Sequence, residues 1–336
     1  MVMKPTISVI VITYNQEETI GRTLDSILMQ QCHVPYEIVV GEDCSTDNTL
    51  AVCKRYAEQH PDTIRILANK ENKGPVNNYF DCMLQCRGEY IADCAGDDFW
   101  SDPKKLEKEV SILETSPNIT LVHTAWNNFH VDSGLTTESD CQPFTAPVTK
   151  GTEMLEDIIV QTRIPVVHLC TSLYRKAIVL AELEKDEFMF RNKEFGCEDL
   201  QVAFVMAQHG DIAYLPERTL NYSVGEESVS SPADHSKLFR FTKRVSSLSY
   251  YLSQKYNLHS PRIDRYFAHR IFELGMHAFR AHDEQLFHET LQCEKEWKIG
   301  RTKKVAIVCF VMRHKWLWAL GLQARRCIVT LKQLFR

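Results

Sequence analysis

The feature that most constrains the fold is an alternation of short apolar runs with helical stripes over the first hundred residues. Residues 7–12 read Ile-Ser-Val-Ile-Val-Ile, which is typical of a strand buried on both faces of a parallel sheet. A helical stripe follows at i, i+4, i+7 and i+8: Ile20, Leu24, Ile27 and Leu28. Further strands are expected at 38–40, 64–67 and 90–92, with helical segments between them. This order predicts a doubly wound α/β layer.

Polar residues cluster where each expected strand ends. They are Thr13, Tyr14, Asn15 and Glu17 after the first strand, Glu42 and Asp43 after the second, residues 69–74 after the third, and Gly96, Asp97 and Asp98 after the fourth. Ligands of open parallel sheets bind beyond the carboxyl ends of the strands. We therefore expect these segments to meet at one edge, where two acidic turns share a ligand that carries a cation.

The pair Asp97-Asp98 has the chemistry of a hard-metal site. Carboxylate oxygens suit magnesium or manganese, which bind one or two protein carboxylates and complete their shell with substrate phosphates. The alternative is a polar turn before a helix that starts near Pro103. The position beyond a buried strand, with Phe99 and Trp100 packed behind it, favours the metal site.

Two other acidic segments carry alternatives of their own. Asp43 can accept hydrogen bonds from a base or a ribose, whereas residues 45–47, Ser-Thr-Asp, are expected to do little more than start the next helix. Glu198 and Asp199 precede an apolar helical stretch. They either complement the positive end of that helix or include a general base that takes a proton from a hydroxyl.

Taken together, residues 9–15, 39–47, 88–92 and 96–98 resemble the inverting family 2 glycosyltransferases of the GT-A fold. The resemblance covers roughly residues 5–225 and implies a Rossmann-like, doubly wound mixed sheet with a helical extension after it. It implies a nucleoside diphosphate sugar as donor, with UDP as the expected carrier. The residues that it places at the nucleotide sugar are Thr13, Tyr14, Asn15, Glu17, Asp43, Gly74 and Asp97. It implies Mn²⁺ or Mg²⁺ on Asp97, with Asp98 beside it, Asp199 as general base, and Glu198 as the residue that orients the acceptor.

The sequence departs from the family pattern in two places. Ala95 stands where the first acidic residue of the DxD motif is usual, so weaker metal affinity is expected. Ser223 and Gly225 stand where members often have an Arg and a His that meet the diphosphate. Phosphate contacts must then come from elsewhere, and the candidates are Lys73, His235 and Lys237. His168 either faces the acceptor or is an ordinary core residue.

Composition limits the remaining classes. The 336 residues are 44% apolar and 25% charged, with a net charge of −5, so a globally basic nucleic-acid binder is not expected. Twelve cysteines occur without a CxxC pair, which favours reduced thiols in the cytoplasm over a disulfide scaffold. Residues 1–6 lead directly into the first strand and do not have the pattern of a signal peptide.

Two domains are expected, a catalytic one over residues 1–230 and a helical one over 231–336. The last 36 residues, 301–336, contain nine Lys or Arg and no Asp or Glu. Their apolar segments are too short to span a bilayer. Two interpretations stay open: a helix lying on an anionic membrane surface, at the inner face of the cell membrane, or a terminal helix docked on the protein.

The sequence thus predicts a metal-dependent hexosyltransferase-like enzyme that acts on a glycan or lipid-linked acceptor in cell-surface polysaccharide synthesis. One rival is a nucleotide-sugar-binding protein that has lost turnover, which Ala95 and the missing Arg and His would explain. A nucleotidyltransferase or a dehydrogenase is disfavoured because residues 13–16 read Thr-Tyr-Asn-Gln, without a glycine-rich phosphate loop.

Overall fold

The structure is a computed structural model that describes residues 5–139, 146–161, 167–225, 234–298 and 302–314, with 316, 317, 319–321 and 323. The chain divides into two compact units, Met1–Gly225 and Glu226–Arg336. The boundary expected at residue 230 lies outside the described residues.

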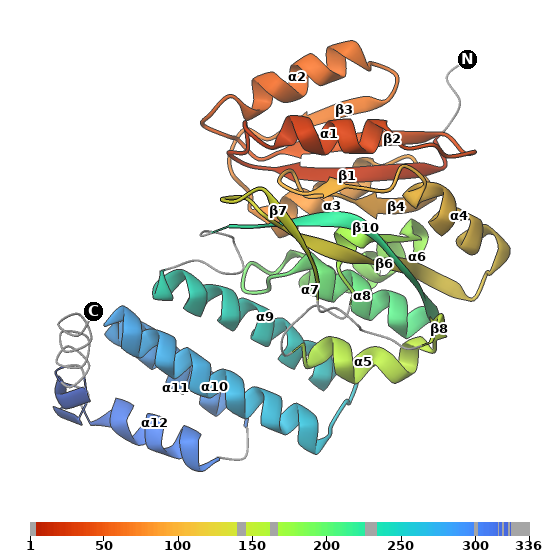
Figure 1. Cartoon of the computed structure of the whole chain (residues 1–336). Coiled ribbons are helices and arrows are strands. Elements are labelled where there is room, and N and C mark those ends of the chain that lie inside the picture. The colour runs from red at the N-terminus through yellow and green to blue at the C-terminus, as the bar shows by residue number, and fades with distance from the viewer. Residues whose placement is uncertain are drawn as a thin grey trace. The chain divides into compact units, whose positions relative to one another are not determined.

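The first part of unit 1 has the predicted alternation. Its strands are β1 (Ile7–Thr13), β2 (Tyr36–Glu42), β3 (Ile64–Ala68) and β4 (Tyr90–Asp93), and its helices are α1 (Ile20–Leu28), α2 (Thr49–Gln59) and α3 (Pro75–Gln85). The strands are parallel in the order β3-β2-β1-β4, and Figure 1 shows them side by side in red to orange. The prediction of a doubly wound layer is confirmed.

The sheet continues with strands of mixed direction. They are β5 (Phe99–Trp100), β6 (Ile119–His130), β7 (Leu135–Glu138), β8 (Val148–Thr149), β9 (Ser172–Arg175) and β10 (Asp211–Val224). β9 runs antiparallel to both β4 and β6, whereas β10 runs parallel to β6. The long strands β6 and β10 cross the unit in Figure 1. The chain therefore carries the Rossmann-like layer and the mixed sheet that the sequence predicts.

The helices of this second part are α4 (Lys105–Thr115), α5 (Gly151–Ile159), α6 (Lys176–Lys185), α7 (Glu187–Arg191) and α8 (Glu198–His209), with the short 3₁₀ helix η1 (Leu169–Thr171). α4 packs against β6 and β9, and α5 packs against α8. Both η1 and the first turn of α8 supply residues to the candidate site below.

The core explains why β1 is so apolar. Ile7, Val9 and Val11 are fully buried because neighbouring strands flank β1 on both edges and helices cover the sheet. Gly88 lets the chain enter β4 close to β1, since a Cβ on it would lie 2.5 Å from the backbone nitrogen of Ser8. Packing of β1 against its neighbours therefore fixes the positions of β1 and β4 relative to each other.

Unit 2 is helical, as predicted. It contains α9 (His235–Lys255), α10 (Pro261–Ala281), α11 (Glu284–Glu296) and α12 (Lys303–Arg313). Side chains of Asp234, Ser260, Asp283 and Thr302 cap the helix starts. Among the described residues of the chain, no helix has the length and apolarity needed to cross a membrane.

Candidate nucleotide and acid-base site

The loop after β1 is joined to the loop after β2 by side-chain hydrogen bonds. Asn15 accepts the backbone N–H of Thr46 at 2.8 Å, and its own N–H donates to Ser45 Oγ at 3.0 Å. Asp47 accepts from the N–H of Glu17 at 3.1 Å as well as from Thr49 at the start of α2. The expectation that residues 45–47 do little more than start a helix is therefore too narrow, because they also fix the β1 loop.

The side chains of Asn15 and Glu17 are used mainly in the hydrogen bonds that join these two loops, referred to below as the joint. Glu17 accepts from both the backbone and the side-chain nitrogen of Asn48. Tyr14, in contrast, is 45% exposed, and its ring is free to stack on a planar ligand. All three predicted nucleotide-binding residues are exposed, and Tyr14 is the one whose side chain takes no part in this joint.

Asp43 is buried and organises the loop after β3. Its Oδ1 accepts from Asn69 Nδ2 and from the backbone N–H of Lys73, both at 2.9 Å, and its Oδ2 accepts from the N–H of Gly74 at 2.9 Å. A carboxylate has about four acceptor sites, and the protein uses three of them here. One site, on Oδ2, is left for a ligand donor. Gly74 has φ of 79°, a conformation that glycine adopts without strain.

The turns that carry Asp43 and Asp97 meet at the end of β1. The backbone N–H of Asp43 donates to the Thr13 carbonyl at 3.0 Å, and that of Gly96 donates to the Ile12 carbonyl at 3.1 Å. A Cβ on Gly96 would lie 2.8 Å from Thr13 Oγ1, so this position has no room for a larger residue. Thr13, Asp43 and Asp97 are thereby brought to one edge of the sheet.

Asp97 and Asp98 have different surroundings. Burial raises the pKa of Asp97, while Gln16, Arg22 and His168 act to lower it. Asp98 is 1% exposed, and its Oδ1 accepts the backbone N–H of Ser223 at 2.8 Å. Burial and the charge of Asp97 hold the pKa of Asp98 well above its usual value. Asp97 is the more accessible of the two, whereas Asp98 fastens β10 to the turn after β4.

Asp199 lies in the first turn of α8 and contacts η1. Its Oδ1 accepts the backbone N–H of Leu169 at 2.8 Å. The preceding residue, His168, is held between the rings of Trp126 and Tyr222, and its Nδ1 accepts the N–H of Cys170 at 3.3 Å. Burial lowers the pKa of His168, and the charges of Asp199 and Asp97 oppose that shift. One imidazole therefore lies near both carboxylates.

Two more carboxyl groups lie close to Asp199. Burial, followed by the charge of Asp199, raises the pKa of Glu198. Asp93, at the end of β4, is fully enclosed, and burial holds its pKa well above the usual value. The hydroxyl of Tyr79, which is hydrogen-bonded to Tyr174, acts against this shift. Burial thus favours the protonated form of Asp93, which would limit the negative charge beside Glu198 and Asp199.

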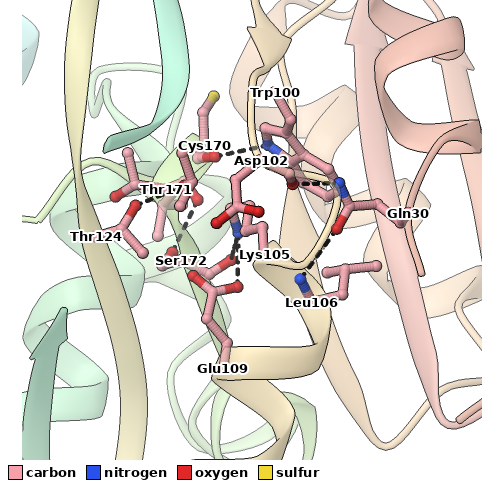
Figure 2. A network of polar contacts seen from close by, with 12 residues as sticks. Gln30, Trp100, Asp102, Lys105, Leu106, Glu109, Thr124, Cys170, Thr171 and Ser172 are labelled. Carbon is pink, nitrogen blue, oxygen red and sulfur yellow. Dashed lines mark hydrogen bonds and ion pairs between the residues drawn. The ribbon is translucent and has the colours of Figure 1, made fainter. Parts of the chain in front are cut away.

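Behind the site, a buried polar network joins β5 and α4 to η1 (Figure 2). Trp100 Nε1 donates to the Cys170 carbonyl at 3.0 Å. The Lys105 ammonium pairs with Glu109 at 2.7 Å, donates to the Ser172 carbonyl at 3.5 Å and lies 4.6 Å from the centre of the Trp100 ring. These contacts fix η1 and the start of β9, and with them the Leu169 amide that binds Asp199.

This arrangement agrees with a comparison of the sequence against family models. The model described as glycosyl transferase family 2 matches residues 8–180, which is more than half of the chain. The chain belongs to glycosyl transferase family 2. The match includes Thr13, Asp43 and Asp97, and it ends before α8.

Individual relatives are similar over shorter stretches. An uncharacterized protein of Mycobacterium tuberculosis is 40% identical over 114 residues, which are 34% of this chain and 33% of that protein. The putative teichuronic acid biosynthesis glycosyltransferase TuaG of Bacillus subtilis is 33% identical over 110 residues, 33% of this chain and 42% of that protein. The chain thus matches less than half the length of these two relatives.

A solved structure extends the likeness to the fold. The structure of S. aureus TarS 1–349 in complex with UDP-GlcNAc superposes with a TM-score of 0.55 at 17% identity, and the match covers 92% of each chain. This neighbour and the mixed sheet together show that the family 2 chain has the predicted GT-A fold.

The residues at Asp97 are compatible with a divalent ion. Asp97 offers a partly exposed carboxylate, Ala95 offers none, and Asp98 already accepts from Ser223. Within the described residues, the one group of three close metal-binding side chains is Cys32, His33 and Glu107, away from this site. A family 2 site with one protein carboxylate fits a magnesium or manganese ion that takes most of its ligands from phosphates and water.

The residues predicted to bind phosphate differ in their surroundings. The Lys73 ammonium is paired with Asp81 at 2.7 Å, and His235 and Lys237 belong to α9 in unit 2 and stay predictions. Sequence reasoning missed Arg22, whose Nη2 donates to the Asp97 carbonyl at 2.9 Å. On the sequence Arg22 is one polar residue of an amphipathic helix, so no local signal could have found it.

Proposed function

We propose that this chain is an inverting glycosyltransferase that moves a sugar from a nucleoside diphosphate sugar to an acceptor hydroxyl. The observation that carries the proposal is that the charges of Asp97 and Asp199 both act on the imidazole of His168, and that the turns of Asp97 and Asp43 meet at the end of β1. In this proposal, one site holds both the sugar donor and the base that activates the acceptor hydroxyl. UDP is the proposed carrier, supported by the UDP-GlcNAc complex of TarS.

Asp199 is the proposed base. Its Oδ1 is held by the Leu169 amide, and its Oδ2 accepts only the weak S–H donor of Cys197 at 3.8 Å, so Oδ2 is the atom proposed to take the proton of the acceptor hydroxyl. The acceptor oxygen then bonds to the anomeric carbon from the face opposite the diphosphate, the bond to the diphosphate breaks, and the configuration inverts. Glu198 is proposed to orient the acceptor. A divalent ion on Asp97, with Asp98 behind it, would offset the charge on the departing diphosphate.

On the donor side, Asp43 and Tyr14 are proposed to hold the nucleoside. The acceptor site left on Asp43 Oδ2 can bind an N–H of the base, and the exposed ring of Tyr14 can stack on it. Thr13, Asn15, Glu17 and Gly74 shape this site through the backbone contacts described above.

The rival is a family member that binds the nucleotide sugar without turning it over, which Ala95 favours. A thermal-shift screen of UDP- and GDP-sugars with and without manganese, followed by transfer and hydrolysis assays on the sugars that bind, separates the two. Stabilisation together with release of nucleoside diphosphate supports the transferase. Binding without turnover across donors and acceptors supports the rival.

The proposed acceptor is a glycan or lipid-linked glycan of a cell-surface polysaccharide, for which the name of TuaG is the support. A protein acting on such an acceptor would work in the cytoplasm, at the inner face of the membrane. α12 has an apolar exposed side: Ile307 is 63% and Phe310 55% exposed, beside Lys303 and Lys304. We propose that this helix and Trp316 contact anionic lipid.

A further inference from the structure

Arg22 is a cation at the candidate site that neither the family pattern nor the proposed mechanism accounts for. It lies on α1, and its Nη2 donates both to the Asp97 carbonyl at 2.9 Å and to Ser223 Oγ at 3.3 Å. The turn of Asp97 and strand β10 are thus joined through one guanidinium group. Ser223 is the residue that stands where an Arg is usual in the family.

Aromatic rings hold the guanidinium in place. Its central carbon lies 4.2 Å from the centre of the Phe99 ring and 4.9 Å from that of Phe129, and these two rings meet edge to face at 5.2 Å. Such stacking fixes the orientation of the fork without neutralising its charge. The cation is therefore preorganised, because few rotamers remain open to it.

The protein leaves much of this group unsatisfied. In the part of the chain that the structure describes, Arg22 forms no ion pair with a carboxylate, its Nε is buried without an acceptor, and its Nη1 makes no hydrogen bond. A guanidinium has five N–H donors and is never deprotonated at neutral pH. The two hydrogen bonds of Nη2 account for a structural role of that nitrogen. Among the described residues, Nε and Nη1 have no acceptor.

We propose that Arg22 binds the diphosphate of the donor, as the fixed cation beside Asp97 that takes the place of the Arg missing at position 223. The inference rests on the proposed function, since the ligand is the nucleoside diphosphate that the site would bind. The proposal also explains how the site can function with Ala95 in place of an acidic residue. The site has one acidic residue fewer than the family motif, and Arg22 restores the cation that position 223 lacks, so part of the phosphate charge is balanced by Arg22 without a metal ion.

The test compares UDP with uridine by calorimetry, using the full chain in EDTA so that no divalent ion contributes. Uridine reports the nucleoside contacts, and the ratio of the two dissociation constants reports the diphosphate contacts. We expect the wild type to bind UDP about tenfold to a hundredfold more tightly than uridine. Equal affinities for the two ligands in EDTA would overturn the inference without any variant.

Arg22→Met keeps the length of the side chain and removes the charge. UDP binding should weaken by about tenfold or more, with uridine binding changed less than about twofold. Arg22→Lys should lie between, because it keeps the charge but loses the fork. Arg55→Met, on the exposed side of α2, is the matched control and should change neither ligand.

A purely structural role gives a different result. If Arg22 only linked the Asp97 turn to Ser223, Arg22→Met would weaken the binding of uridine and UDP alike. It could also leave both affinities unchanged and lower the melting temperature. Either result overturns the inference. A wild type that binds neither uridine nor any nucleoside diphosphate, with or without manganese, would overturn the proposed function itself.

Discussion

At the scale of single residues, neighbouring acidic side chains are given different surroundings. Asp97 stays partly exposed while Asp98 is buried against β10, and Asp199 accepts a backbone amide while burial raises the pKa of Glu198. Neighbouring carboxyl groups in different surroundings are suited to separate tasks. In the first pair, Asp97 is the carboxylate that stays partly exposed, whereas both members of the second pair do.

Restoring the missing acidic residue should strengthen metal binding. Ala95→Asp adds a second carboxylate near Asp97, and we expect the manganese concentration for half-maximal UDP binding to fall by about tenfold. Ala95→Asn is the control for size, because it brings no charge. Equal manganese dependence in the two variants would mean that residue 95 does not face the ion.

Glu198 provides a test in pH. Its pKa is raised from 4.5 to about 7 in the folded chain, so between these values the folded state binds more protons than the unfolded state. Stability therefore falls as the pH rises through this window. Glu198→Gln lacks this loss, so its melting temperature relative to the wild type should increase from pH 5 to pH 8. A difference that is the same at both pH values would contradict the assignment.

At the scale of elements, the site depends on a short segment that several elements fix from behind. Asp199 on α8 binds Leu169 of η1, and the carbonyls of the same segment accept from Trp100 on β5 and Lys105 on α4. These contacts join residues 30 to 70 positions apart. The proposed base is thus positioned by packing among elements and not by its own helix alone.

The buried pair at the centre of this network can be tested. Lys105 and Glu109 are both 0% exposed, so Lys105→Met should destabilise the fold by about 3–5 kcal/mol because it leaves Glu109 unpaired. The double variant Lys105→Met/Glu109→Leu should recover most of that loss. Urea unfolding measures both, with Lys104→Met on the exposed side as control. If Lys105→Met were as stable as the wild type, the buried ion pair would not contribute to the stability of this network.

The difference between what the sequence predicted and what it missed lies at this scale too. Strands and the acidic turns after them follow from local periodicity, so β1 to β4 and the positions of Asp43 and Asp97 could be predicted. Arg22 and the Trp100–Cys170 contact could not, because each depends on residues that packing brings together from 70 to 201 positions away. Likewise, the sequence does not distinguish Asp97 from Asp98, whereas their burial does.

At the scale of the whole molecule, the family match, the GT-A fold and the two units belong together. The family model ends at residue 180, yet the candidate base lies at 199 and the helices of unit 2 follow. α12 packs on α10 through its buried residues Val305 and Cys309, which leaves the other side of the helix apolar and exposed. Docking within unit 2 and contact with a membrane are therefore compatible.

That exposed side predicts lipid binding by the full chain. The protein should float with vesicles that contain an anionic lipid and much less with neutral vesicles, and 0.5 M salt should weaken binding. Phe310→Glu/Trp316→Glu should abolish flotation. Phe188→Glu, at a residue that is 57% exposed in unit 1, is the matched control. Flotation of the double variant at the wild-type level would contradict a lipid contact through α12.

The most direct test of the central claim is the turnover of Asp199→Asn beside its binding of UDP. The change keeps the size of the side chain and removes the ability to take a proton, so the transfer rate should fall by about 10²- to 10⁴-fold while the dissociation constant for UDP stays within about twofold. Asp62→Asn, at an exposed position, should keep both values. A variant at residue 199 that transfers sugar at the wild-type rate would contradict the account.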